Sequence, residues 1–153
     1  MKIVLLYRGS RDGWTIANFH SKCDNKGPTI MFVKTSLGRL CGAFTPLPWD
    51  STGSWKKDES KQAFLFSLDS FTSYPLTDPI YTIFCRNDHG PLFGYGGHNL
   101  WIGYMAILNT ANASYCQLGS NFSIPGDKDG ASPLTGEKVN FTCAEVEIFS
   151  VGN

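Results

Sequence analysis

Frequent turn-forming residues constrain the fold of this chain more than any other feature of its sequence. The 153 residues include 16 glycines and 8 prolines, which are spread along the whole chain. Glycine adopts positive φ without strain and proline cannot continue a helix, so these residues divide a chain into short elements joined by turns. We therefore expect many short elements rather than a few long ones.

Most of the apolar segments between these turns have the pattern of β-strands. Residues 40, 42 and 44 alternate as in a paired strand, whereas residues 29–33 form a continuous apolar run that predicts a strand buried on both faces. In the last segment Ala144, Val146 and Ile148 face one way, and Glu145 and Glu147 face the other. Strands are expected at residues 3–7, 29–33, 40–44, 63–68, 80–85 and 141–151, with two more around a bend within 92–108.

One segment has helical periodicity. Ile16, Phe19 and Cys23 are spaced so that they share one face of a helix, which Asp12 or a neighbour can cap. One helix among many strands predicts an α+β, β-rich fold: two antiparallel sheets packed as a sandwich with a few short flanking helices, in a single domain over residues 1–153. The core residues expected between the two sheets are Ile30, Phe32, Phe64, Phe66, Ile83, Val146 and Ile148.

The charge balance argues against several classes of partner. Lys plus Arg and Asp plus Glu each total 13, so the formal net charge is +0. No basic excess steers the chain toward nucleic acid or an anionic membrane. No apolar stretch approaches the roughly 18 residues of a membrane-spanning helix, and the first apolar run is too short for a secretion signal. We therefore expect a cytoplasmic protein without nucleic-acid binding or direct membrane insertion.

The five cysteines are widely spaced, and no two form a C-x-x-C motif. This arrangement indicates neither a disulfide framework nor a zinc site, so reduced thiols without a metal or cofactor are expected. Cys116 lies in a loop-rich segment rather than in a strand pattern. It is therefore the best candidate for an exposed, redox-sensitive thiol.

Two pairs of residues are candidates for function. Trp49 and Trp55 lie in a polar, turn-rich segment over residues 45–60, where tryptophan can anchor a protein interface or fold back into the core. Glu145 and Glu147 are two residues apart on a strand, so their Cα atoms are roughly 6.5–7 Å apart on one face. Such a pair can serve acid–base hydrolysis, bind a partner or remain a solvated surface.

Six segments carry a set of motifs in a fixed order. They are LLYRGSRDG at residues 5–13, FHxxCDNKGPTI at 19–30, GAFT at 42–45 followed by Trp49, AFLFSL at 63–68, GPLFG at 90–94 continuing to GHNLWI at 97–102, and EVEIF at 145–149. Together, across nearly the whole chain, they resemble the TLDc family. The chain departs from the family pattern at Asn99, where relatives often carry aspartate, and at Ala43, where a second glycine is usual.

This resemblance implies a pair of antiparallel sheets with helices packed outside, in agreement with the strand pattern. It also implies the family's roles in resistance to oxidative stress and in regulating the vacuolar proton-pumping ATPase by binding its peripheral subunits. No accepted catalytic mechanism belongs to the family. The expected function is therefore a non-enzymatic protein-interaction module, monomeric as an isolated domain, in the cytoplasm at the cytosolic face of acidic organelles.

Two other classes of function stay open on the residues alone. The chain can be an enzyme, either a thiol peroxidase built on a cysteine or a carboxylate-pair hydrolase built on Glu145 and Glu147. It can also be a ligand-binding sandwich in which Trp49, Trp55 and Trp101 stack on a sugar or peptide. A pocket that joins a carboxylate pair or a thiolate to a histidine would favour the enzyme. An aligned aromatic groove would favour the ligand-binding sandwich.

Overall fold

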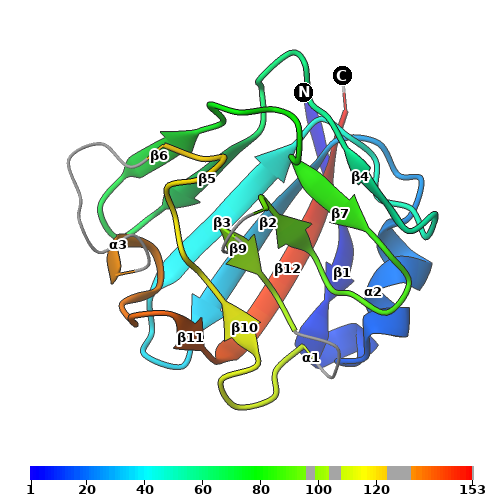
Figure 1. Cartoon of the computed structure of the whole chain (residues 1–153). Helices are drawn as coiled ribbons and strands as arrows, with labels where there is room; N and C mark the ends of the chain where they lie inside the picture. Colours follow the sequence, from blue (N-terminus) through cyan, green and yellow to red (C-terminus); the bar gives the residue numbers. More distant parts are fainter. Residues whose placement is uncertain (96–98, 104–107, 124–131, 153) are drawn as a thin grey trace.

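Two antiparallel β-sheets face one another in the computed structural model of the protein, which describes residues 1–95, 99–103, 108–123 and 132–152 (Figure 1). Within these residues each sheet has six strands. The predicted β-rich sandwich with short helices is confirmed. Turn residues set the lengths of its elements; Gly38, for example, has a φ of 81° in the turn that ends the second strand of the chain.

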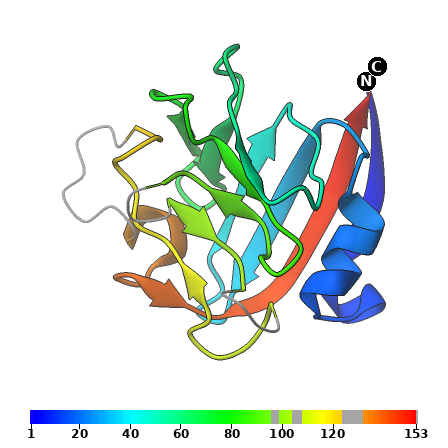
Figure 2. The same ribbon diagram turned by 45° about the vertical axis from the view of Figure 1, so that its right-hand side comes forward.

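The first sheet brings the two ends of the chain together. Its strand order is β1 (Lys2–Arg8), β12 (Cys143–Gly152), β2 (Thr29–Thr35), β3 (Leu40–Thr45), β5 (Phe64–Ser67) and β6 (Thr72–Pro75). The pairing of β1 with β12 starts at Lys2↔Gly152, so the N- and C-termini lie side by side in both views (Figures 1 and 2). One edge of this sheet therefore depends on the last strand of the chain.

The second sheet is built from strands of two or three residues. Its order is β11 (Asn140–Phe141), β10 (Ser114–Tyr115), β9 (Leu100–Trp101), β8 (Leu92–Phe93), β7 (Ile83–Cys85) and β4 (Ser54–Lys56). The two strands predicted within residues 92–108 correspond to β8 and β9. No strand was predicted within the turn-rich segment over residues 45–60, yet β4 pairs there with β7; this strand is too short to show a period in the sequence.

In the part of the chain that the structure describes, two helices lie beside β1 at one edge of the sandwich, and the third lies on the opposite side of the sandwich. They are α1 (Gly9–Asp12), α2 (Ile16–Cys23) and α3 (Ser132–Thr135), and Figure 2 shows α1 and α2 next to β1. The buried face of α2 is the predicted one, with Ile16, Phe19 and Cys23. Its cap is Thr15, whose hydroxyl accepts the Asn18 N–H at 3.1 Å. No helix among the described residues is long and apolar enough to cross a membrane.

A row of aromatic rings crosses the core and joins α2 to both sheets. The Trp49 ring packs edge-on against Phe19 and Phe93, with both centroid distances at 5.5 Å. Phe93 in turn contacts Phe122 at 6.3 Å. The indole Nε1 of Trp49 donates to the Thr29 hydroxyl at 3.0 Å, so its one polar group is satisfied inside the core.

The predicted core is correct for three residues and wrong for four. Ile83, Val146 and Ile148 are fully buried between the sheets, whereas Ile30, Phe32, Phe64 and Phe66 lie together on the outer face of the first sheet and line a groove there. Burial alternates along β2, so this strand is not buried on both faces. An all-apolar run has no polar residue to mark the outer face, which is why the sequence could not assign it.

The outward side chains of the first sheet cover one another instead. Phe32 packs edge-on against Phe66 and Phe149, at 5.5 Å and 5.8 Å between ring centroids. Phe44 lies 5.5 Å from Phe64 on the neighbouring strands. These cross-strand pairs leave the rings only partly exposed, so an aromatic layer stabilises the sheet from outside.

The facing predicted for β12 holds from Glu145 onward but fails at Ala144. The pairing of β12 with β2 is irregular between Cys143 and Glu145, as in a β-bulge. This shift turns Cys143 into the core and leaves Ala144 exposed, while Val146 remains buried. Strict alternation cannot anticipate an inserted residue of this kind.

Candidate interaction surfaces

An aromatic cluster surrounds Trp55 on the outer side of the second sheet. The pairing of β4 with β7 places Trp55 opposite Phe84, and their ring centroids are 4.8 Å apart. Tyr81 and Tyr95 lie 5.3 Å and 5.7 Å from the same indole. Trp55 is half-buried, whereas Tyr81 is 37% and Tyr95 is 53% exposed. We call Trp55, Tyr81, Phe84 and Tyr95 the Trp55 cluster.

The backbone beneath the Trp55 cluster is fixed by polar contacts. The Lys56 ammonium group bonds the Asp50 carboxylate and the Pro48 carbonyl, each at 2.5 Å. Burial works to raise the pKa of Asp50, but hydrogen bonds from Lys56 and Thr52 outweigh it and hold that pKa at about 2. The Thr82 N–H also donates to the Lys56 carbonyl at 3.0 Å. The cluster is therefore presented on a rigid base, which lowers the entropy lost on binding.

Trp49 does not belong to this surface. It is 1% exposed and lies at the centre of the core, so the prediction that it anchors an interface is wrong. Trp101 is 5% exposed and its ring stacks on His89 at 4.9 Å between centroids, so it cannot serve as an open stacking platform either. Of these three tryptophans only Trp55 reaches the surface, and no aligned tryptophan groove forms.

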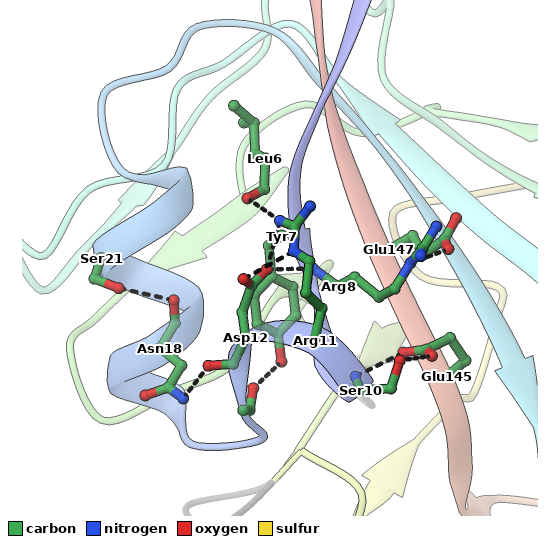
Figure 3. Close-up of polar contacts among 11 residues, drawn as sticks. Leu6, Tyr7, Arg8, Ser10, Arg11, Asp12, Asn18, Ser21, Glu145 and Glu147 are labelled. Carbon is green, nitrogen blue, oxygen red and sulfur yellow. Dashed lines mark hydrogen bonds and ion pairs between the residues drawn. The ribbon is translucent and has the colours of Figure 1, made fainter.

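Glu145 and Glu147 lie on the outer face of the first sheet, where each has its own partner (Figure 3). The Arg8 guanidinium donates from Nε to Glu147 at 2.7 Å. Ser10 donates to Glu145 from its backbone N–H at 3.1 Å and from its hydroxyl at 2.5 Å. Both carboxylates line a shallow hollow of about 200 Å³ that also contains Lys34. The two glutamates thus tie β12 to the start of the chain.

A second set of polar contacts continues from this pair into the helices (Figure 3). The Asp12 carboxylate accepts from the Arg11 guanidinium at 2.7 Å and from the Arg8 N–H at 2.9 Å. The hydrogen bond from Arg11 is the main reason that the pKa of Asp12 is lowered to about 2. Asn18 donates to the Asp12 carbonyl at 2.6 Å, and the Tyr7 hydroxyl donates to the Gly13 carbonyl at 2.9 Å. Burial raises the pKa of Tyr7, so this hydroxyl stays a donor.

This arrangement favours a structural and binding role for the two glutamates over hydrolysis. A carboxylate-pair hydrolase needs room for a water or sugar between its two acids. Here one carboxylate is ion-paired with Arg8 and the other is occupied by Ser10 and by the Val146 N–H at 3.1 Å. Among the described residues no group of three or more His, Cys, Asp and Glu could hold a metal ion.

All five cysteines are free and buried, which overturns the expectation for Cys116. Cys116 is 0% exposed and its thiol donates to the Asn99 carbonyl at 3.0 Å. Burial raises the pKa of all five thiols, to about 11 for Cys85 and about 12 for Cys143. The prediction rested on the loop-rich composition of this segment. In the structure Cys116 directly follows β10, and its side chain is buried in the hydrophobic core. None of these thiols has the exposed, low-pKa environment that a peroxidase requires.

Two buried polar clusters escaped the sequence analysis. The His20 ring bonds the Asp24 carboxylate from Nδ1 at 2.8 Å and the His89 carbonyl from Nε2 at 2.9 Å, which joins α2 to the turn before β8. The side chain of Asn99 is fully buried and bonds the backbone at Gln117. The partners at His89 and Gln117 are 69 and 18 residues away in the sequence, so only the three-dimensional structure reveals them. His98, which precedes Asn99 in the glycine-rich segment, lies outside the described residues.

The family model for the TLDc domain matches residues 1–152, which is nearly the whole chain. The resemblance seen in the six sequence segments is thereby confirmed, and the chain belongs to the TLDc family.

Proposed function

We propose that this chain is a non-enzymatic protein-interaction module of the TLDc type and that the Trp55 cluster is its principal contact surface. The observation that supports this proposal is that Trp55 packs against two exposed tyrosines, Tyr81 and Tyr95. Tryptophan and tyrosine dominate the energetic centres of protein interfaces because they bury a large area with few rotatable bonds. A half-buried tryptophan with exposed neighbours is thus prepared for docking.

The partner that we propose is the peripheral part of the vacuolar proton-pumping ATPase. The basis is the family resemblance, which links TLDc proteins to this enzyme and to resistance to oxidative stress. The module then works in the cytoplasm at the cytosolic face of acidic organelles, and it needs no cofactor. Its effect on stress resistance is indirect, through the complex that it binds.

Glu145 and Glu147 supply a second, weaker contact in this proposal. They lie on the first sheet, whereas the Trp55 cluster lies on the second, so a single flat partner surface cannot cover both. Glu145 has no ion pair among the described residues, so a basic group of a partner can approach it. Charges at the rim of an interface mainly steer the encounter and affect the association rate.

Two observations argue against the alternative proposals of a thiol peroxidase and of a carboxylate-pair hydrolase. A thiol peroxidase needs a thiolate that peroxide can reach, and burial keeps all five thiols protonated at neutral pH. A hydrolase needs free carboxylates, and both glutamates have partners. A binding role requires neither group to change its state.

Binding of the purified peripheral sector to the immobilised chain tests this proposal. Truncating an interface tryptophan or tyrosine commonly costs 2 kcal/mol or more, so Trp55→Ala and Tyr95→Ala should each weaken binding roughly thirtyfold. Ile3→Ser is the matched control, since Ile3 is 50% exposed, close to the 53% of Tyr95. The double change Glu145→Lys/Glu147→Lys should mainly slow association. Melting curves establish that each variant is folded.

Three outcomes separate the parts of this proposal. Unchanged binding by both aromatic variants would exclude the Trp55 cluster as the contact surface. Failure of the wild-type chain to bind the peripheral sector would exclude the proposed partner. Turnover of peroxide by the wild-type chain, lost on one Cys→Ser change, would instead support the peroxidase.

A further inference from the structure

The large hydrophobic side chains that are exposed in the described residues fall into three groups. One is at the N-terminus, and one consists of Ile80 together with Tyr81 and Tyr95 of the Trp55 cluster. The third has four members, at the end of the first sheet where β2 turns into β3 and β5 turns into β6; their exposed fractions are 62% for Leu37, 41% for Leu40, 38% for Leu68 and 92% for Phe71. An apolar group of this kind on a soluble surface commonly marks a site of interaction.

The two turns of this third group are adjacent and joined. β3 pairs with β5 at Cys41↔Ser67, so the turns leave the sheet at the same end. The Leu68 N–H donates to the Leu40 carbonyl at 2.9 Å, and the Leu40 N–H donates to the Asp69 carboxylate at 2.8 Å. All residues of 36–40 and 68–71 are exposed. We call these two segments the apolar tip.

Phe71 is hard to explain by folding alone. Its φ is 52°, in the left-handed region that asparagine and glycine adopt more readily than an aromatic residue. Its side chain is 92% exposed, so it contributes little to the core. A phenylalanine here costs backbone energy without a gain from burial in the free chain. A contact outside the chain would supply that gain.

The charges beside the apolar tip favour an anionic surface. Lys34 and Arg39 are exposed, and neither has an ion pair among the described residues. Asp69 is held by the Leu40 N–H, and residues 34–40 and 68–71 together carry two cations and one carboxylate, a net charge of +1. Glu145 is opposite Lys34 in the register, but its carboxylate is turned to Ser10. The tip itself thus carries Arg39 and Asp69, and Lys34 adds a second cation directly beside it.

Apolar surface continues from the tip along the outer face of the first sheet. Leu68 and Phe71 line an open groove of about 380 Å³ whose surface is mainly apolar. Its other lining residues are Ile30, Phe32, Phe64, Phe66, Ser67, Thr72 and Ser73. The tip and the groove therefore form one continuous apolar surface, while the charged side chains of this face, Lys34, Glu145 and Glu147, line the neighbouring hollow. A peptide-binding groove would be recessed, whereas the side chains of Leu37 and Phe71 at the tip are 62% and 92% exposed.

From these observations we propose that the apolar tip docks on a phospholipid bilayer with anionic headgroups. Leu37 and Phe71 enter the boundary between headgroups and acyl chains, and Lys34 and Arg39 meet the phosphates. Apolar burial and attraction to anionic lipid act together in peripheral binding of this kind. The cytosolic leaflets of cells carry such lipids. This mode departs from the sequence-based expectation of no membrane insertion, which concerned spanning helices and net charge.

The proposal is independent of the proposed function, because the tip and the Trp55 cluster are on different sheets. A chain that rests on a membrane through its tip still presents the Trp55 cluster to a protein partner. Variants of one surface leave the other intact. Failure of one proposal is thus distinguishable from failure of the other.

A fluorescent label at the tip measures insertion directly. All five native thiols are buried, so Leu37→Cys can be labelled selectively with an environment-sensitive dye. Ile80→Cys is the matched control, since Ile80 is 52% exposed next to the Trp55 cluster. With vesicles of phosphatidylcholine and phosphatidylserine at about 70:30, the label at position 37 should shift to the blue and the label at position 80 should not.

Co-sedimentation with the same vesicles measures affinity. Leu37→Ser combined with Phe71→Asn should lower binding roughly tenfold or more without loss of stability, because asparagine suits the left-handed backbone at position 71. Lys34→Gln and Arg39→Gln should each lower it about fivefold, and only for vesicles that contain phosphatidylserine. Ile80→Ser should bind like the wild-type chain.

Several results would overturn the proposal. The wild-type chain could remain in solution both with vesicles that contain phosphatidylserine and with vesicles of phosphatidylcholine alone, or the tip double variant could bind as well as the wild type. A blue shift of the label at position 37 without vesicles, growing with protein concentration, would assign the tip to contact between two copies of the chain. Equal shifts at positions 37 and 80 would show non-specific adsorption.

Discussion

Replacing Asn99 by aspartate tests how the structure uses a residue that departs from the family pattern. The Asn99 side chain is 0% exposed and makes four hydrogen bonds. Its amide nitrogen donates to the Gln117 carbonyl at 3.1 Å and to the Ser120 hydroxyl at 2.7 Å. Its oxygen accepts the N–H groups of Asn121 and Phe122 at 3.1 Å and 2.9 Å. A carboxylate can keep the two accepted bonds but cannot donate to Gln117.

The expected cost of Asn99→Asp follows from these contacts. The Gln117 carbonyl loses its donor and faces a buried negative charge, which together should cost about 2–3 kcal/mol at neutral pH. Asn99→Ala removes every bond and strands two buried N–H groups as well, so it should cost about 3–5 kcal/mol. Neither change exceeds the usual stability of a domain of this size, about 5–15 kcal/mol, so both variants should fold.

Urea unfolding followed by tryptophan fluorescence measures these differences. Burial raises the pKa of a carboxyl at position 99, and the protonated carboxyl can donate to Gln117. The cost of Asn99→Asp should therefore be largest at neutral pH and shrink as the pH falls toward 4. Asn87→Asp, at an exposed asparagine, is the control and should change stability little. Equal stability of Asn99→Asp and wild type at neutral pH would refute this reasoning, as would a gap that widens in acid.

Three further predictions follow from other buried or paired groups. Trp49→Ala should lower the free energy of unfolding in urea by about 3–5 kcal/mol, because it opens a cavity between Phe19 and Phe93. A loss as small as that of a surface substitution would contradict the buried position of Trp49. The pKa of Asp12 is lowered to about 2 by Arg11, so its stabilisation is present above about pH 4 and lost as the pH falls to about 2. The difference in melting temperature between wild type and Asp12→Asn should shrink over that range, and a constant difference would contradict the assignment. Titration of native thiols should label none of the five cysteines quickly and all five in denaturant; rapid native labelling of Cys116 would contradict its burial.

The sequence predicted the fold best where local patterns carry the information. The spacing of Ile16, Phe19 and Cys23 specified the buried face of α2, and turn residues marked most strand ends. Glu145 and Glu147 share the outer face as predicted, because alternation holds from the bulge onward. These features depend on residues close in the chain.

The errors arose where distant parts of the chain decide the outcome. The outer aromatic layer of the first sheet could not be recognised because Phe32 and Phe66 come from β2 and β5, which β3 separates in the sheet, and their rings meet only after folding. Trp49 and Trp55 are six residues apart in one polar segment, yet the core takes one and the surface keeps the other. Cys116 was expected to be exposed because it lies in a loop-rich segment, whereas the structure buries it in the core. Composition does not encode which loop covers which sheet.

Hydroxyl-radical footprinting with the peripheral sector of the vacuolar ATPase tests the central claim most directly. The method measures the solvent access of individual side chains, and Trp55, Tyr81 and Tyr95 are reactive aromatic residues at the surface. If the Trp55 cluster is the contact surface, oxidation of these three residues should fall when the partner binds. Oxidation of Tyr115, on β10 of the same sheet but outside the cluster, should stay constant. Stable binding with unchanged oxidation at Trp55, Tyr81 and Tyr95 would contradict the account.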